Sequence, residues 1–125
     1  MADTVEISNL NKTWIFDIDG TLFKYDGYKT EGKDTILPGV REFMDKIPKE
    51  DAIIIISARE KQYEKFTKKS LKENKIRYDK LIIGVPVGER ILVNDIKPRG
   101  LKCAIAVNTQ RDVFMEENFV VNEEL

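Results

Sequence analysis

Apolar residues in this chain gather in short runs separated by charged stretches, a pattern typical of strands buried in a parallel sheet. Such runs lack the alternation of apolar and polar residues that marks a strand with one face in water. Five of them predict strands, at residues 13–16, 52–56, 76–83, 90–93 and 103–107.

Two stretches between these runs have the apolar spacing of helices. Residues 38–47 carry apolar side chains at i, i+3, i+4 and i+7, and Pro38 occupies a first helical position, where proline is favoured. Residues 60–73 carry a second apolar stripe. The alternation of strands and helices predicts an α/β fold, with a mainly parallel sheet, helices on its faces and right-handed crossovers.

The remaining segments are expected to be connections within one domain, residues 1–125. Residues 22–37 mix aromatic, glycine and charged positions and predict a loop or short flap. Residues 84–89 are too few for a helix and predict an extended loop. The tail from residue 111 is expected to form a short helix and then an exposed strand.

Composition limits the chemistry. Lys and Arg total 21 against 22 for Asp and Glu, so nothing indicates a nucleic-acid partner. No histidine is present, which removes Ser-His-Asp, Cys-His and the common zinc chemistries. Cys103 is the only cysteine, so no internal disulfide can form. Without a signal-like or membrane-spanning run of apolar residues, a cytoplasmic protein is expected.

Polar residues that could take part in catalysis or bind a metal follow three of the predicted strands. Asp17 and Asp19 follow the first, Ser57 ends the second, and Asp95 follows the run ILV at residues 91–93. In open parallel sheets, ligands bind beyond the carboxyl ends of the strands, so these side chains are expected to meet. Oxygen ligands alone favour Mg²⁺. The plainer alternatives are turn residues for the acids and a helix N-cap for Ser57.

The strings FDIDGTLF, IIIISAR and ILVND, in this order, resemble the first, second and fourth motifs of the haloacid dehalogenase (HAD) superfamily. The resemblance spans about residues 13–107 and implies a three-layer α/β/α domain with a Rossmann-like sheet. Most members are Mg²⁺-dependent phosphatases. The segment VNDIKPRGLK further resembles small members from bacterial surface-polysaccharide clusters.

The resemblance implies a role for each matching residue. Asp17 would attack phosphorus to give an aspartyl-phosphate, and Asp19 would protonate the leaving oxygen and then activate water. Mg²⁺ would bind the Asp17 carboxylate, the Asp19 backbone carbonyl and Asp95. Ser57 would donate a hydrogen bond to a phosphoryl oxygen.

Two positions depart from the family pattern. The helix that usually carries the third-motif lysine has no counterpart, so Lys97 is the leading substitute, with Lys80 and Arg59 as alternatives. For each of the three, an ordinary surface charge is the plainer interpretation. The fourth motif often has two acids, whereas this chain has Asn94 and Asp95.

The expected substrate is a small phosphorylated metabolite, and the polysaccharide-cluster resemblance suggests a sugar or polyol phosphate. Residues 22–37 are too few for a cap domain, so a large substrate or a partner subunit could close the site. Tyr25 and Tyr28 could line its entrance or serve in packing. Two other functions stay open: a non-catalytic phospho-receiver or phosphate-binding domain, and a glycosyltransferase using Asp-x-Asp. Asp19 argues against a receiver, which needs no general acid there.

Overall fold

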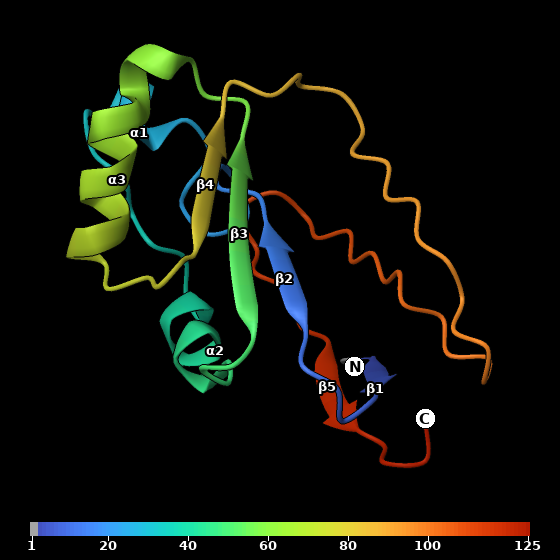
Figure 1. Cartoon of the computed structure of the whole chain (residues 1–125). Helices are drawn as coiled ribbons and strands as arrows, with labels where there is room; N and C mark the ends of the chain where they lie inside the picture. The colour runs from blue at the N-terminus through green and yellow to red at the C-terminus, as the bar shows by residue number, and fades with distance from the viewer. Residues whose placement is uncertain (1–2) are drawn as a thin grey trace.

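The computed structural model describes residues 3–125 and contains two sheets, both parallel (Figure 1). The larger sheet has the order β2-β3-β4, and the smaller pairs β1 with β5. The strands are β1 (Thr4–Ile7), β2 (Thr13–Phe16), β3 (Ala52–Ser57), β4 (Lys80–Ile83) and β5 (Asn118–Val121). The α/β class and the parallel pairing predicted from the sequence are therefore confirmed.

The two predicted helices are present with slightly shorter bounds. Helix α2 spans Val40–Lys46, and helix α3 spans Glu64–Glu73 after the 3-10 turn η1 (Lys61–Tyr63). A further short helix, α1 (Gly27–Thr30), lies within the predicted flap. Gly39, rather than Pro38, precedes the first turn of α2, with a φ of 88° that suits glycine.

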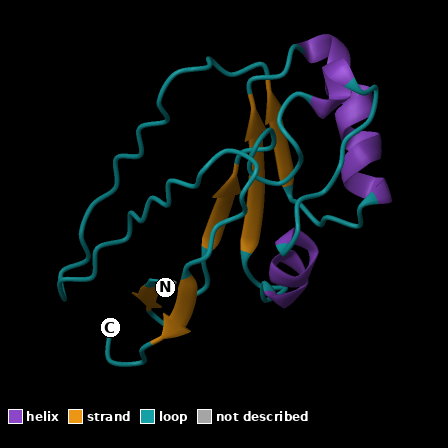
Figure 2. Ribbon diagram, turned by 180° about the vertical axis from the view of Figure 1, so that it is seen from behind, coloured by secondary structure: helices purple, strands orange, loops and turns teal. Residues whose placement is uncertain are grey.

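Helices α2 and α3 cover the same face of the larger sheet. Ile53 and Ile55 on this face are fully buried, in one apolar cluster with Val40, Met44 and Leu71 of the two helices. Successive right-handed crossovers that add strands in one direction place their helices on one side, as Figures 1 and 2 show. The third layer expected from the resemblance is not formed on the other face.

The opposite face of the larger sheet is apolar and open. Ile15 of β2 is 51% exposed and Ile82 of β4 is 44% exposed, while Ile54 and Ile56 between them are partly exposed. Strand β2 ends the sheet, so the backbone groups along its outer edge have no strand partner in the part of the chain that the structure describes.

The strands predicted at residues 90–93 and 103–107 are not formed. Residues 86–109, here called the arm, leave the end of β4, swing out beyond β2 and return (Figures 1 and 2). A tight turn at the arm's far end carries an isolated bridge between Ile96 and Lys102. Ile91 and Val93 are 86% and 87% exposed. These runs have strand-like sequences, but no strand among residues 3–125 pairs with them.

The tail contains the expected strand, β5, but the helix predicted from residue 111 is wrong. Residues 110–113 form a turn in which the Val113 N–H donates to the Gln110 carbonyl at 3.1 Å. Strand β1, in a segment interpreted only as polar, was not predicted. Among residues 3–125, no helix has the length and apolar character needed to cross a membrane.

Candidate functional site

A tight turn after β2 holds Asp17 and Asp19. The Ile18 carbonyl accepts hydrogen bonds from three successive N–H groups, those of residues 21–23, at 2.9–3.1 Å. Gly20 has a φ of +81°, and a Cβ there would lie 3.1 Å from Arg111 Cγ. The positive φ favours glycine at this position, and a Cβ there would crowd the side chain of Arg111 in the returning tail.

Arg59 organises the buried side of the site. Its Nε and Nη2 donate to the two oxygens of Asp19, each at 3.0 Å. Its Nη1 and Nη2 donate to Asp34 at 3.1 and 2.7 Å, and Nη1 also donates to Thr67 Oγ1 at 3.0 Å. The guanidinium carbon lies 4.0 Å from the ring centroid of Tyr28. Arg59 is 2% exposed, so this cation is paired and hydrogen-bonded inside the protein, as burial of a charge requires.

Burial changes the acid-base character of Asp19. Removal from water raises the pKa of Asp19 above its ordinary value, and the hydrogen bonds and charge of Arg59 oppose that rise without cancelling it. Burial alone lowers the pKa of Arg59, but its bonds to Asp19 and Asp34 outweigh this and raise it. Arg59 therefore stays charged, while Asp19 holds its proton to a higher pH than an exposed aspartate does.

Asp17 has a different environment. Its side chain is 35% exposed, and its Oδ1 accepts from Arg90 Nη1 at 2.9 Å. Its Oδ2 accepts from the Thr21 hydroxyl at 3.2 Å. The two acids of the turn thus pair with different arginines. Asp17 pairs with Arg90 and is accessible to solvent, whereas Asp19 pairs with the buried Arg59.

Ser57 ends β3 and is 1% exposed. Its Oγ accepts the Arg59 N–H at 3.0 Å, two residues along the chain. Since η1 begins only at Lys61, Ser57 shapes the loop and is not the helix N-cap suggested as its plainer role. This bond also connects Ser57 to the residue that holds Asp19.

Three of the predicted site residues lie elsewhere. Asp95 and Lys97 are exposed on the arm, because the strand that was to carry them to the site is not formed. Lys80 begins β4, at the amino end of the sheet, whereas the site is at the carboxyl end. The Asn94 side chain donates to the Asp95 carbonyl at 3.2 Å and contacts none of the acids in the turn.

The donors for Mg²⁺ are only partly assembled in one chain. The Asp17 carboxylate and the Asp19 carbonyl belong to the same turn, and no described residue donates a hydrogen bond to that carbonyl. Asp95 lies on the arm. Within residues 3–125, no cluster of three or more His, Cys, Asp or Glu side chains forms a metal site. The single chain therefore does not fit the full ligand set that the resemblance implies.

Two residues that contact the predicted site residues were missed in the sequence. Asp34 lies in the segment interpreted as a flap, and nothing local marks it as the second partner of Arg59. Arg90 opens the run ending at Asp95, but only its contact with Asp17 reveals it. Of the two tyrosines of the same segment, Tyr28 is buried against Tyr63 and serves in packing. Tyr25 is partly exposed, and its ring centroid lies 3.5 Å from the guanidinium carbon of Arg111.

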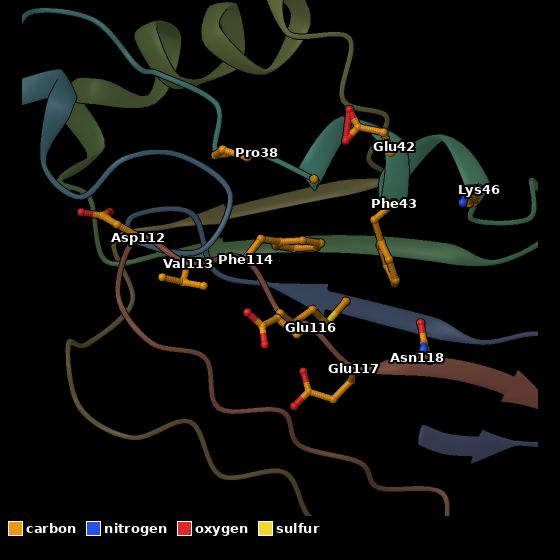
Figure 3. A pocket seen from close by; sticks show the side chains of 12 residues that line it. Pro38, Glu42, Phe43, Lys46, Asp112, Val113, Phe114, Glu116, Glu117 and Asn118 are labelled. Carbon is orange, nitrogen blue, oxygen red and sulfur yellow. The ribbon is translucent and has the colours of Figure 1, made fainter. Parts of the chain in front are cut away.

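A groove of about 570 Å³ lies apart from this site, between α2 and residues 112–118 (Figure 3). Phe43 and Phe114 line it, with ring centroids 5.5 Å apart in an edge-to-face contact. Neither acid of the turn lines it, nor do Ser57 or Arg59. We therefore interpret the groove as part of the packing interface between α2 and residues 112–118, where aromatic side chains meet.

Comparison with known proteins gives no relative. No protein-family model, no curated protein and no solved structure matches this chain.

Proposed function

We propose that this protein is a phosphatase that hydrolyses a phosphate monoester through an aspartyl-phosphate on Asp17. The observation that carries the proposal is the contrast between two acids of one turn. Asp17 is accessible, whereas burial raises the pKa of Asp19. Carboxylates in unlike environments are suited to separate roles, here nucleophile and general acid.

The reaction has two steps. A carboxylate oxygen of Asp17 attacks phosphorus, the bond from phosphorus to the ester oxygen breaks, and Asp19 gives its proton to that leaving oxygen. Asp19, now a carboxylate, takes a proton from water as the water oxygen attacks the phosphorus of the acyl phosphate. Inorganic phosphate leaves, Asp17 is restored, and Asp19 is protonated again.

Arginines support both acids. Arg90 is positioned to offset the repulsion between the Asp17 carboxylate and an anionic phosphate, the task for which the sequence suggested a lysine. Ser57 is suited to donate its hydroxyl proton to a phosphoryl oxygen. Mg²⁺, when bound, supplies further compensation of the negative charge.

Arg59 keeps Asp19 in place during proton transfer. For Asp19 to hold a proton, one of its oxygens must release its bond from Arg59. Asp34, whose side chain is 1% exposed, keeps the guanidinium paired while this happens. Arg59 is therefore a positioning residue for Asp19.

The open side of the site supports a proposal for the substrate class. Asp17 is reached from outside without passing a cap, which suits a phosphate on a bulky or extended molecule. The sequence resemblance to polysaccharide-cluster members favours a sugar or polyol phosphate.

The test is turnover of p-nitrophenyl phosphate and a panel of sugar, polyol and nucleotide phosphates. We expect activity with Mg²⁺, its loss with EDTA, and a fall of at least about a thousand-fold in kcat for Asp17→Asn, because the nucleophile is removed. Asp45→Asn, an exposed acid of α2, is the matched control and should retain full activity. A folded protein with no turnover on any substrate would reject the proposal and favour a phosphate-binding or receiver-like domain.

A further inference from the structure

The arm and the open sheet each have what the other lacks. On the arm, Ile91 and Val93 are 86% and 87% exposed, in a run with a strand-like sequence and no strand partner. On the sheet, β2 has an unpaired outer edge, and Ile15 beside that edge is 51% exposed. Unpaired edges and exposed apolar runs are both costly, and pairing them would bury both.

The direction of residues 91–95, on the outgoing half of the arm, prevents this run from extending its own sheet as a parallel strand. The arm starts at the carboxyl end of β4 and runs back beyond β2 towards the amino ends of the strands (Figure 1). Arg90 is held at the carboxyl end by its 2.9 Å bond to Asp17. Residues 91–95 therefore run antiparallel to their own β2 and carry Asp95 away from their own Asp17.

We propose that residues 90–95 of one copy pair with β2 of a second copy, forming an arm-exchanged dimer. A twofold axis perpendicular to the strands turns the second copy upside down. The arm that is antiparallel to its own β2 is then parallel to the partner's β2, the sense of every strand pair in this protein. The contact is reciprocal, as twofold interfaces are.

The spacing along the arm supports this arrangement. Arg90 and Asp95 are five residues apart, which spans about 17 Å in a strand, while Thr13 to Asp17 spans about 13 Å. An arm whose Arg90 lies at Asp17 of its own copy therefore extends far enough to bring Asp95 to Asp17 of the other copy. If the proposed function holds, each site combines Asp17, Asp19 and Arg90 from one copy with Asp95 from its partner. That arrangement completes the Mg²⁺ ligand set that one chain leaves partial.

The first experiment measures mass in solution by size-exclusion chromatography with light scattering. The wild type should have twice the chain mass of 14.5 kDa. Ile91→Asp combined with Val93→Asp should give the monomer without unfolding it, because both side chains are exposed in the single chain. Val87→Asp is the matched control, on the same arm and 91% exposed but outside residues 90–95, and should remain dimeric. A monomeric wild type, or a dimer that survives the double substitution, would overturn the proposal.

The second experiment identifies the partner of the arm by cross-linking. Ile15→Cys and Val93→Cys are introduced together with Cys103→Ser, and a short bis-maleimide is added. Arm exchange predicts a band at twice the chain mass on a denaturing gel, absent when either new cysteine is omitted. A cross-linked band that stays at the mass of one chain would show that the arm folds back on its own sheet, against the proposal.

The third experiment tests the shared site and separates this inference from the proposed function. Asp17→Asn and Asp95→Asn proteins are each expected to be inactive, and after subunit exchange an equal mixture should recover about a quarter of wild-type activity, because half of the dimers then hold one intact site. No recovery from an exchanged mixture would overturn the sharing of Asp95. A cross-linked dimer without phosphatase activity would reject the proposed function and support the exchange. An active monomer would support the proposed function and reject the exchange.

Discussion

Strand β3 and the arm have similar sequences and opposite surroundings. Residues 52–57 read AIIIIS and residues 90–95 read RILVND, each an apolar run that ends in a polar residue. Strand β3 has a parallel neighbour on either side and helices over one face, so Ile53 and Ile55 are fully buried. In the arm, the corresponding side chains are exposed. An apolar run thus becomes a strand only where another strand offers its backbone. Within residues 3–125, no strand does so for residues 90–93 or 103–107.

The largest expected effect on the free energy of unfolding comes from Arg59, the buried cation in the body of the molecule, by which we mean the described residues outside the arm. Arg59→Leu leaves Asp19 and Asp34 without their partner and should lower the free energy of unfolding by about 3–5 kcal/mol. Arg99→Leu on the arm, where the side chain is exposed, should change it by less than about 0.5 kcal/mol. Urea denaturation followed by circular dichroism measures both. Equal effects from the two substitutions would contradict the contrast between body and arm.

A pair of isoleucines tests the same contrast with apolar side chains. Ile55→Ala removes fully buried methyl groups and should cost about 2–5 kcal/mol of unfolding free energy at any protein concentration. Ile91→Ala should cost less than about 0.5 kcal/mol in dilute protein, where the arm is free.

The cost of Ile91→Ala should then grow as protein concentration rises, because a docked arm gains stability by mass action. Denaturation midpoints measured across a dilution series show this directly. A cost for Ile91→Ala that is large at every dilution would mean that the residue is buried within its own chain.

The smallest effect concerns pH and sharpens the contrast between Asp19 and the arm acid Asp95. Since burial raises the pKa of Asp19 above the ordinary 3.8, the folded protein binds more protons than the unfolded chain between these two values. This contribution to the free energy of unfolding is fully present below pH 3.8 and is lost as pH rises through the raised pKa. Asp19→Asn should remove this part of the pH dependence, while Asp95→Asn should keep it. Denaturation across a pH series measures the slopes, and an unchanged slope in Asp19→Asn would refute the assignment.

Local sequence was sufficient to predict the elements whose packing partners lie nearby in the same chain. The apolar spacing of residues 38–47 and the run at 52–56 predict α2 and β3 because their partners lie nearby in the same chain. The acids after β2 could be predicted as a pair for the same reason. The tail helix is not formed because Asp112 has a φ of 66°, outside the right-handed helical region, and its N–H donates to the distant Gly20 carbonyl at 2.9 Å.

The rest depends on contacts that a local pattern does not contain. Asp34 lies 25 residues before Arg59, and only the fold brings them together. Arg90 contacts Asp17 across 73 residues, so a search for a lysine at the family position could not find it. Asp95 was placed by assuming a strand whose partner the single chain does not provide.

The pairing of β1 with β5 determines the order in which the two sheets can form during synthesis. Thr4 lies beside Asn118, so β1, which is synthesised before β5, can pair only after β5 has emerged from the ribosome. Until then Trp14 lacks its edge-to-face contact with Phe119, at a centroid distance of 5.0 Å. The β2-β3-β4 sheet, by contrast, can assemble once residue 83 has emerged from the ribosome. A ribosome stalled before residue 118 should therefore carry a nascent chain in which the β2-β3-β4 sheet is formed and β1 is unpaired.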